Sequence, residues 1–368
     1  MKILVIQDYL RNGGTERQAV LLARAFREAG HDTTLLTFRP GGTLSRELAG
    51  VEHRVLQPFD LGLDWFAPRL IHTAAQFAPD VVLCMGRAAN RHAAALQRSL
   101  PRAAVVATVR TDKPQPWLVQ RSLHRARHVV ANSHEARKRL IALHGVDAGK
   151  ISVIHNSLVF PPDTAVPARD EALRARQGAG PGCVVMLCVA MFRSEKGQRA
   201  LIEIAAQLPR ERDWQLWLAG DGPTRAGCES LARELGIAGR VRWPGFLSDP
   251  RPLYRASDVA VLASRNESLS NFLIEAQAHK LPAVAFDATG VGECFAPDES
   301  GFLIPRGDSA GFRAAVERLL ADPALRIRMG ARGGAYAAEC FAPARQVRAY
   351  LDLFARLLTV SAAHEIIA

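Results

Sequence analysis

The chain has few cysteines for its 368 residues, and none of them form a C-x-x-C pair. The six cysteines stand at positions 84, 183, 188, 228, 294 and 340, most of them inside apolar runs. That placement is typical of reduced thiols in a protein core. The sequence therefore predicts neither a disulfide framework nor a zinc site.

Long hydrophobic runs are also absent. The longest uninterrupted apolar run covers residues 183–192, about half of the roughly 20 residues that span a bilayer. Near the start, the apolar run 3–6 ends at Gln7 and Asp8, which is too short for the core of a secretion signal. We therefore expect no transmembrane helix, no signal peptide, and a protein that stays in the cytoplasm.

Acidic residues are scarce in one region. The net charge is +11, and residues 98–150 hold eleven Lys and Arg against Asp112, Glu135 and Asp147, a difference of +8. Such a patch favours a polyanion or an anionic membrane surface. A solvated face in an arginine-rich chain explains it equally well, because only six of the 47 basic residues are lysine. The sequence leaves both interpretations open.

Apolar runs alternate with amphipathic segments in the first 156 residues. We expect strands at 2–7, 33–38, 81–85, 104–109, 129–131 and 151–154. Helical patterns separate several of them, such as the segment from Glu16 to Ala29 that stops at Gly30. This alternation predicts an α/β fold with a doubly wound parallel sheet.

A second series of the same kind follows a segment rich in proline, glycine and charge at 160–182. Its expected strands lie at 184–190, 214–219, 259–263 and 283–286, and the tail 308–358 is expected to be helical. The length also favours two domains. We place them at 1–162 and 163–344, with a helix at about 345–368 packing back on the first. Ligands of such sheets bind beyond the carboxyl ends of the strands, so we expect the site in a cleft between the domains.

The stretch SRNESLSNFLIE at 264–275 carries two glutamates eight positions apart. Glu267 is expected in a loop after a strand, and Glu275 about one turn inside a helix capped by Ser268, Ser270 or Asn271. The amides and dipole of a helix start favour phosphate, and the two acids can accept hydrogen bonds from sugar hydroxyls. A nucleotide-sugar fits this arrangement, but solvation and dipole stabilisation also explain two glutamates around a helix start, and the pair by itself favours that simpler interpretation.

With its surroundings, this stretch resembles the glutamate-seven-residues-glutamate motif of the retaining glycosyltransferases of family 4. The resemblance covers nearly the whole chain and implies the GT-B fold, in which two Rossmann-like doubly wound domains face a central cleft. The first domain then binds the acceptor and the second binds the nucleotide-sugar donor.

The resemblance also implies roles for residues of the second domain. Glu267 corresponds to the acid that contacts the donor sugar, and Arg193 and Lys196 of the segment MFRSEKG neutralise the leaving diphosphate. These three are the expected catalytic residues. Glu275 is expected to hold the ribose, while the amides of Leu269 and Ser270 meet the distal phosphate. Most relatives have glycine where this chain has Ser268.

Three further positions are expected at the donor. Gly13 and Gly14 follow the first strand, where glycine lets the backbone approach a diphosphate. Phe246, in the segment WPGF, corresponds to the residue that borders the base, although a core role is equally consistent with the sequence. The turn Gly220 to Pro223 is expected to be structural.

Asn12 and Arg110 are expected on the acceptor side. Many relatives place a histidine after the strand that corresponds to 104–109, where this chain has Arg110. Arginine cannot act as a base at neutral pH but can orient a hydroxyl or a phosphate. His92, His134 and His155 are interpreted as cap, surface or core residues.

We therefore expect a retaining transferase that needs no cofactor and no metal ion, because the chain contains no D-x-D pair. The expected partners are a nucleotide-sugar, with UDP preferred, and a glycan or lipid-linked acceptor of lipopolysaccharide or polysaccharide assembly. Residues 98–150, with Trp117, predict peripheral binding to the inner face of the cell membrane. No nucleic-acid module is present. The alternatives are a GT-B nucleotide-sugar 2-epimerase and a non-catalytic basic protein that binds glycan or nucleic acid.

Overall fold

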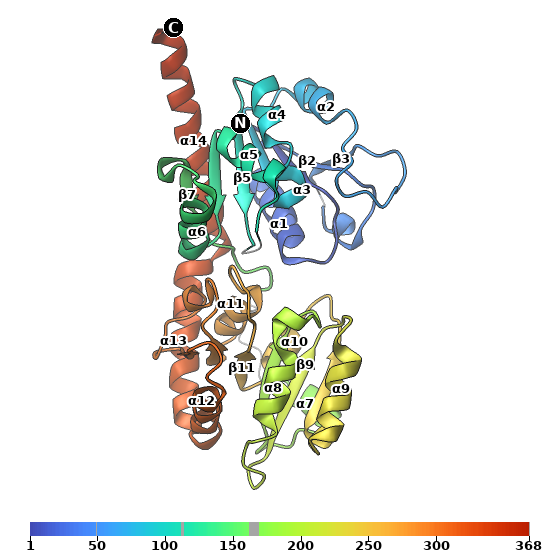
Figure 1. The fold of residues 1–368 in the computed structure, drawn as a ribbon, viewed down its shortest axis with the longest axis vertical. Helices are drawn as coiled ribbons and strands as arrows, with labels where there is room; N and C mark the ends of the chain where they lie inside the picture. Colours follow the sequence, from blue (N-terminus) through green and yellow to red (C-terminus); the bar gives the residue numbers. More distant parts are fainter. Residues whose placement is uncertain (49, 112–113, 162–168, 368) are drawn as a thin grey trace. The chain divides into compact units, whose positions relative to one another are not determined.

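The computed structural model describes residues 1–48, 50–111, 114–161 and 169–367, with side chains up to residue 359. The chain divides into two compact units. Unit 1 comprises Met1–Val159 with Pro343–Ala368, and unit 2 comprises Phe160–Ala342. The boundary expected at 162–163 lies outside the described residues. Each unit is an α/β structure with one parallel sheet (Figure 1).

Unit 1 contains a seven-stranded sheet in the order β3-β2-β1-β4-β5-β6-β7. Parallel pairing brings Val5 of β1 opposite Leu35 of β2 on one side and Leu83 of β4 on the other. β1 lies between β2 and β4, so the order of the strands along the chain changes direction at β1. The strands are β1 (Lys2–Gln7), β2 (Asp32–Thr37), β3 (Glu52–Val55), β4 (Val81–Met85), β5 (Ala104–Val109), β6 (His128–Ala131) and β7 (Ile151–Val153).

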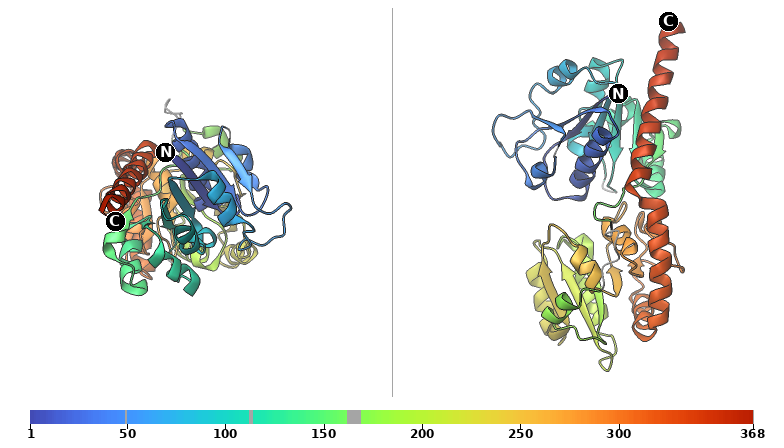
Figure 2. Two further views of the ribbon diagram at one scale, coloured as in Figure 1. Left: turned by 90° about the horizontal axis from the view of Figure 1, so that it is seen from above. Right: turned by 180° about the vertical axis from the view of Figure 1, so that it is seen from behind.

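Helices cover both faces of this sheet, because successive strand side chains point to opposite faces. Leu4 and Ile6 pack on one face with α2, α4, α5 and α6, while Ile3 and Val5 pack on the other with α1 and α14 (Figures 1 and 2). The helices of the unit are α1 (Gly14–Glu28), α2 (Leu70–Phe77), α3 (Gly86–Asn90), α4 (Ala93–Ser99), α5 (Trp117–Arg125), α6 (His134–His144) and α14 (Pro343–Ile367).

The C-terminal helix α14 packs within unit 1. Tyr350 and Phe354 are fully buried, and both rings contact Phe26 of α1, with centroids 6.2 and 5.6 Å apart. The amide of Gln346 donates to Gln18 and accepts from Ser157 at 2.9 and 2.8 Å. Aromatic burial and satisfied buried amides thus hold α14 against α1 and against the chain at Ser157.

Unit 2 contains a six-stranded parallel sheet in the order β10-β9-β8-β11-β12-β13. Here β8 and β11 are neighbours at the point where the strand order reverses. The strands are β8 (Val184–Val189), β9 (Trp214–Ala219), β10 (Val241–Gly245), β11 (Val259–Leu262), β12 (Ala283–Phe286) and β13 (Gly301–Ile304).

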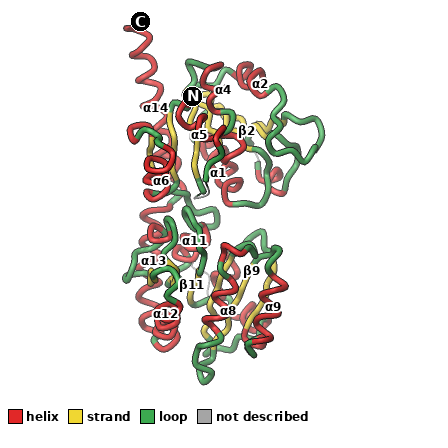
Figure 3. Tube along the Cα trace, in the orientation of Figure 1, coloured by secondary structure: helices red, strands yellow, loops and turns green. Residues whose placement is uncertain are grey.

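Seven helices are described in unit 2. The helices α8 and α9 pack side by side, as do α11 and α13 (Figure 3). The seven are α7 (Glu171–Arg176), α8 (Gln198–Ala205), α9 (Arg225–Glu234), α10 (Arg251–Ala256), α11 (Asn271–Ala278), α12 (Ser309–Ala321) and α13 (Pro323–Phe341). A short 3-10 turn, η3 (Ser194–Lys196), lies between β8 and α8.

The structure confirms the predicted fold class, with two doubly wound parallel sheets. All six cysteines are free, and five of them are buried. Within the described residues, no helix combines the length and the apolar character needed to cross a bilayer.

Candidate functional site

Two loops meet where the strand order of unit 2 reverses. One carries η3 after β8, and the other joins β11 to α11. The backbone N–H of Arg265 donates to the Glu195 carbonyl at 2.8 Å. Gly197, with φ of +74°, lies so close that a Cβ there would be 2.0 Å from the Ala263 carbonyl oxygen. Only glycine permits this approach, so the sequence K-G at 196–197 fixes the position of Lys196.

Lys196 and Glu267 form an ion pair across these loops. The Lys196 ammonium donates to Glu267 Oε1 at 2.6 Å, and the Ser264 hydroxyl donates to the same oxygen at 3.1 Å. The two charged side chains are 25% and 11% exposed. The structure therefore brings two of the three expected catalytic residues together, within a partly buried and charge-assisted contact.

Arg193, the third expected catalytic residue, lies at the N-terminal end of η3. Its side chain is exposed, and it forms no ion pair with any acid in the described part of the chain. The guanidinium is thus three residues from Lys196 and open to solvent. An exposed, uncompensated cation beside a buried ion pair is suited to an anionic ligand.

Ser270 caps the helix α11, and its hydroxyl accepts from the Leu273 N–H at 3.4 Å. The Ser270 N–H itself donates to the Cys294 thiol at 3.3 Å. Leu269 and Ser270 are only 6% and 4% exposed. The two amides expected to meet phosphate therefore belong to buried residues. The Ser270 N–H donates to the Cys294 sulfur, which is a weak acceptor. A phosphate oxygen can replace that sulfur as the acceptor.

Glu275 lies in α11 one turn after its start and is 5% exposed. Its Oε2 accepts from the Tyr254 hydroxyl at 2.7 Å. Burial, followed by the charge of Glu275, raises the pKa of Tyr254 well above its usual value, so the phenol stays a donor at neutral pH. The structure thus orients Glu275 by a residue that the sequence did not single out, and leaves little of its carboxylate accessible.

Phe246 follows β10 and is 57% exposed. The interpretation of Phe246 as a core residue is therefore wrong, because its ring remains available for contact with a planar ligand. The neighbouring turn is structural as expected. A Cβ on Gly220, where φ is +132°, would be 2.1 Å from the Ala190 carbonyl oxygen, so this turn packs directly on the end of β8.

At the carboxyl edge of β1 in unit 1, Gly13 precedes α1 and its Cα faces the Glu16 carboxyl. The Arg11 guanidinium lies 3.2 Å from Asp8 and 3.9 Å from Glu16, and also pairs with Asp64. Burial, assisted by the charge of Asp8, raises the pKa of Glu16 to about 7. The sequence placed only the Gly13 and Gly14 amides here, whereas the structure adds a carboxyl group that titrates near neutrality.

The buried Glu16 carboxyl predicts a pH-dependent stability. Its pKa in the folded protein is about 7, above the ordinary 4.5, so its contribution is fully present below pH 4.5 and is lost as the pH rises through 7. One pKa unit corresponds to about 1.4 kcal/mol. Relative to Glu16→Gln, the free energy of unfolding of the wild type should fall by up to about 3 kcal/mol between pH 4.5 and 8, measured by urea unfolding. A constant difference between the two proteins over this range would contradict the assignment.

On the expected acceptor side, Arg110 follows β5 and is held within unit 1. Its guanidinium donates to Asn156 and, at 3.0 Å, to the Tyr350 hydroxyl of α14. Its Nε is buried without a partner among the described residues. Asn12 accepts from Arg17. Arg110 therefore links β5 to Asn156 and to the C-terminal helix.

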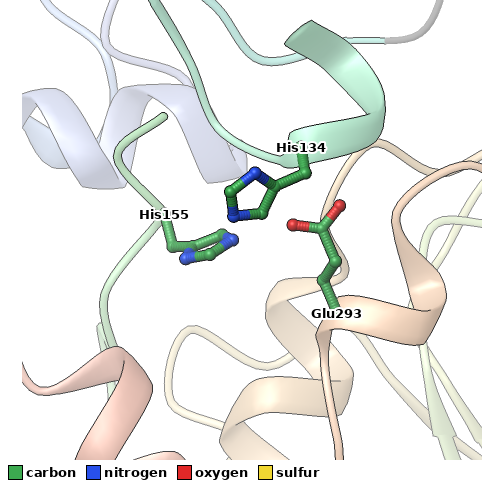
Figure 4. A group of neighbouring side chains, drawn as sticks. All are labelled: His134, His155 and Glu293. Atoms are coloured by element: carbon green, nitrogen blue, oxygen red, sulfur yellow. The ribbon is translucent and has the colours of Figure 1, made fainter. Parts of the chain in front are cut away.

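The histidines fit the structural interpretation. His92 precedes α4 and meets Phe38 edge to face at 5.5 Å. His134 starts α6, and its ring lies 5.7 Å from that of His155 (Figure 4). The third side chain drawn there, Glu293, belongs to unit 2, where its carbonyl accepts from Tyr336 at 3.1 Å.

Comparison with known sequences matches each unit to a glycosyltransferase family model. The family described as "Glycosyl transferases group 1" matches residues 170–335, and the family "Glycosyltransferase Family 4" matches residues 12–158. The lipopolysaccharide core biosynthesis glycosyltransferase LpsE of Rhizobium meliloti is 31% identical over 94% of this chain and 96% of its own length. LpsD of the same organism is 28% identical over 97% of this chain and 98% of its own.

Solved structures share the fold. A glycosyltransferase from Rickettsia africae aligns with a TM-score of 0.83 at 20% identity, covering 97% of this chain and 98% of that one. Anabaena Alr3699/HepE, solved in complex with UDP, aligns with a TM-score of 0.83 at 22% identity, covering 97% of this chain and all of that one. With the two parallel sheets and both family matches, the chain belongs to the family 4 (group 1) glycosyltransferases and has the GT-B fold.

Proposed function

We propose that this glycosyltransferase uses a UDP-sugar and transfers the sugar, with retention of its anomeric configuration, to a glycan or lipid-linked acceptor of lipopolysaccharide or related polysaccharide assembly. The observation that carries the proposal is the Lys196–Glu267 pair of 2.6 Å at the reversal point of the unit 2 sheet. Ligands of doubly wound sheets bind at that point. Glu267 of the pair lies three residues before the cap of α11.

The residues at the reversal point of the unit 2 sheet are best suited to bind the donor diphosphate. Lys196 and Arg193 supply positive charge, and the amides at the start of α11 supply donors. Phe246 offers an exposed ring for the uracil base. UDP is preferred because HepE, a structural neighbour, was solved with UDP and with UDP-glucose. The names of LpsE and LpsD support the acceptor class.

The proposed reaction breaks the bond between the sugar C1 and the phosphate oxygen and forms a bond from C1 to the acceptor oxygen. The acceptor proton passes to the leaving phosphate, so no carboxylate acts as nucleophile. The protein then contributes positioning and stabilisation of the charge that develops on the diphosphate. Glu267, held by Lys196 and Ser264, positions the sugar.

Proton NMR of the reaction with UDP-sugars in excess EDTA tests this function. We expect UDP release and a product whose anomeric configuration equals that of the donor, at an unchanged rate in the chelator. The controls are heat-inactivated protein and Glu267→Gln. An inverted product would contradict retention, loss of activity in EDTA would contradict metal independence, and conversion of the donor to an epimer would identify a 2-epimerase instead.

The proposal includes peripheral association with the inner face of the cell membrane. Residues 98–150 carry a charge difference of +8, and Trp117 is 66% exposed at the start of α5. Cations attract anionic lipid, and an exposed tryptophan suits the bilayer interface. A lipid-linked acceptor is accessible from such a surface.

A further inference from the structure

A groove of about 480 Å³ lies between α4 and α5 on the outer face of unit 1. Its lining includes small side chains of α4, such as Ala94 and Ala95, which leave it open. Cations surround it, and we call these five residues the groove cations: Arg91, Arg98, Arg121, Arg125 and Lys150.

No groove cation forms an ion pair with an acid of the described residues. Two nearby acids in the described sequence, Glu135 and Asp147, have other partners. Glu135 pairs with Lys138 at 3.4 Å, and the Asp147 carboxylate accepts from the Gly149 N–H at 2.9 Å. The Arg91 Nε is buried without a hydrogen-bond partner in the described part of the chain. Five like charges around one hollow repel each other unless an anion binds.

Helix dipoles explain only part of this arrangement. Arg98 and Arg125 lie in the last turns of α4 and α5, where a cation is favourable in any case. Arg91 precedes α4, Arg121 lies inside α5, and Lys150 lies in the turn before β7. Their convergence on the same hollow therefore needs another cause.

One end of the groove lies away from the residues expected to contact the acceptor. Arg98 and Arg125 each precede a strand, β5 and β6, and Lys150 directly precedes β7. They therefore lie toward the amino edge of the parallel sheet. Gly13 and Arg110 follow β1 and β5 and lie at its carboxyl edge. Arg91 and Leu118, at the starts of α4 and α5, lie nearer the carboxyl edge, so the groove runs along both helices and its three cations at the amino edge are the ones farthest from Gly13 and Arg110.

Apolar side chains form the rim on the α5 side. Trp117 is 66% exposed and Leu118 is 45% exposed. The Arg121 guanidinium lies 5.8 Å from the centroid of the Trp117 ring. The boundary between lipid head groups and acyl chains accommodates an exposed tryptophan and leucine beside such cations.

We propose that this groove binds the phosphate of an anionic phospholipid, with the groove cations on the phosphate and Trp117 and Leu118 in the interface. The inference rests on the proposed membrane association and gives it a binding site. Arginine forks match phosphate oxygens, and three of the four groove arginines are exposed at the groove rather than engaged with acids.

The test is co-sedimentation of the full-length protein with two kinds of vesicle. One is phosphatidylcholine alone, and in the other about one lipid in three is the anionic phosphatidylglycerol. The variant is R98Q/R121Q/R125Q. The matched control, R176Q/R210Q/R328Q, removes the same charge from exposed arginines of unit 2. We expect at least a tenfold loss of binding to the anionic vesicles for the groove variant, and less than threefold for the control. UDP binding is measured in the same samples and should be unchanged.

Three results would overturn the inference: equal binding to both kinds of vesicle, equal losses for the two triple variants, or unchanged vesicle binding by Trp117→Ser. Direct binding of glycerol 3-phosphate by a protein that binds neither kind of vesicle would show a site for a soluble phosphate and contradict the lipid. Because UDP binding is recorded separately, failure of the groove does not count against the donor site, and loss of UDP binding in the wild type would count only against the proposed function.

Discussion

Replacing Lys196 with methionine is expected to lower kcat/KM for sugar transfer by at least about a hundredfold. Removing one donor that stabilises developing charge typically costs about 10² to 10³ in rate. Lys196 also pairs with Glu267 at 2.6 Å, and that carboxylate is only 11% exposed. The variant leaves Glu267 without its cation, so we expect an additional loss of about 1–3 kcal/mol in the free energy of unfolding.

A matched control separates this effect from the loss of any surface ion pair. Arg199 pairs with Glu203 at 3.0 Å on α8, but the two side chains are 69% and 46% exposed. Solvent screens such a pair, so Arg199→Met should leave both kcat/KM and stability nearly unchanged. Steady-state kinetics and urea unfolding give both values. If Lys196→Met retained more than a tenth of the activity, Lys196 would not act on the diphosphate.

The second large effect is expected for Gly197→Ala. The residue has φ of +74°, and a Cβ would lie 2.0 Å from the Ala263 carbonyl oxygen and 2.5 Å from its carbon. Positive φ alone costs alanine roughly 1–2 kcal/mol. The overlap adds to this cost because it forces apart the loops that hold Lys196 and Glu267. We expect a total loss of at least about 3 kcal/mol in stability, together with loss of activity.

Gly236→Ala is the control for backbone strain. Gly236 has φ of +69°, and beyond the adjoining residues no described atom lies within 4 Å of the position that a Cβ would occupy, so only the cost of positive φ applies. This variant should lose about 1–2 kcal/mol and keep full activity. Equal destabilisation of the two glycine variants, by thermal or urea unfolding, would show that the two loops do not approach as closely as described.

The strands that the sequence did not reveal share a physical feature. β3, β10 and β13 all lie at the edges of their sheets. Edge strands of a parallel sheet are less buried than central ones, and β3 and β10 also lack a continuous apolar run, whereas β13 reads GFLI. β3 reads EHRV, and β10 contains Pro244, which disfavours a central strand. The central strands, buried on both faces, were predicted to within a residue or two.

The site could be predicted as far as local rules reach. The sequence placed Glu267 in a loop and offered Ser270 as a cap for α11, and the structure confirms both positions. Capping depends on residues a few positions apart. The contacts of Tyr254 with Glu275 and of Cys294 with Ser270 join residues 21 and 24 positions apart. They depend on tertiary packing, which no local pattern encodes.

The Glu16 carboxyl against Gly13 shows a different limit. The two residues are close in sequence, and Gly-Gly after a strand predicted amides facing a phosphate. Whether a nearby side chain folds back over those amides depends on its rotamer and on the burial supplied by neighbours such as Arg11 and Asp8. The Gly-Gly motif thus predicted where the turn lies in the fold, but it did not predict that the Glu16 carboxyl lies beside it.

The most direct test compares the binding of UDP and uridine by calorimetry, because their difference isolates the diphosphate. The wild type should bind UDP at least about a hundredfold more tightly than uridine, or about 2.7 kcal/mol. Lys196→Met should reduce that ratio below about tenfold while leaving uridine binding unchanged. Phe246→Ala should weaken both ligands by the same factor. A full UDP-to-uridine ratio in Lys196→Met would contradict the central claim that Lys196, beside Glu267, binds the donor diphosphate.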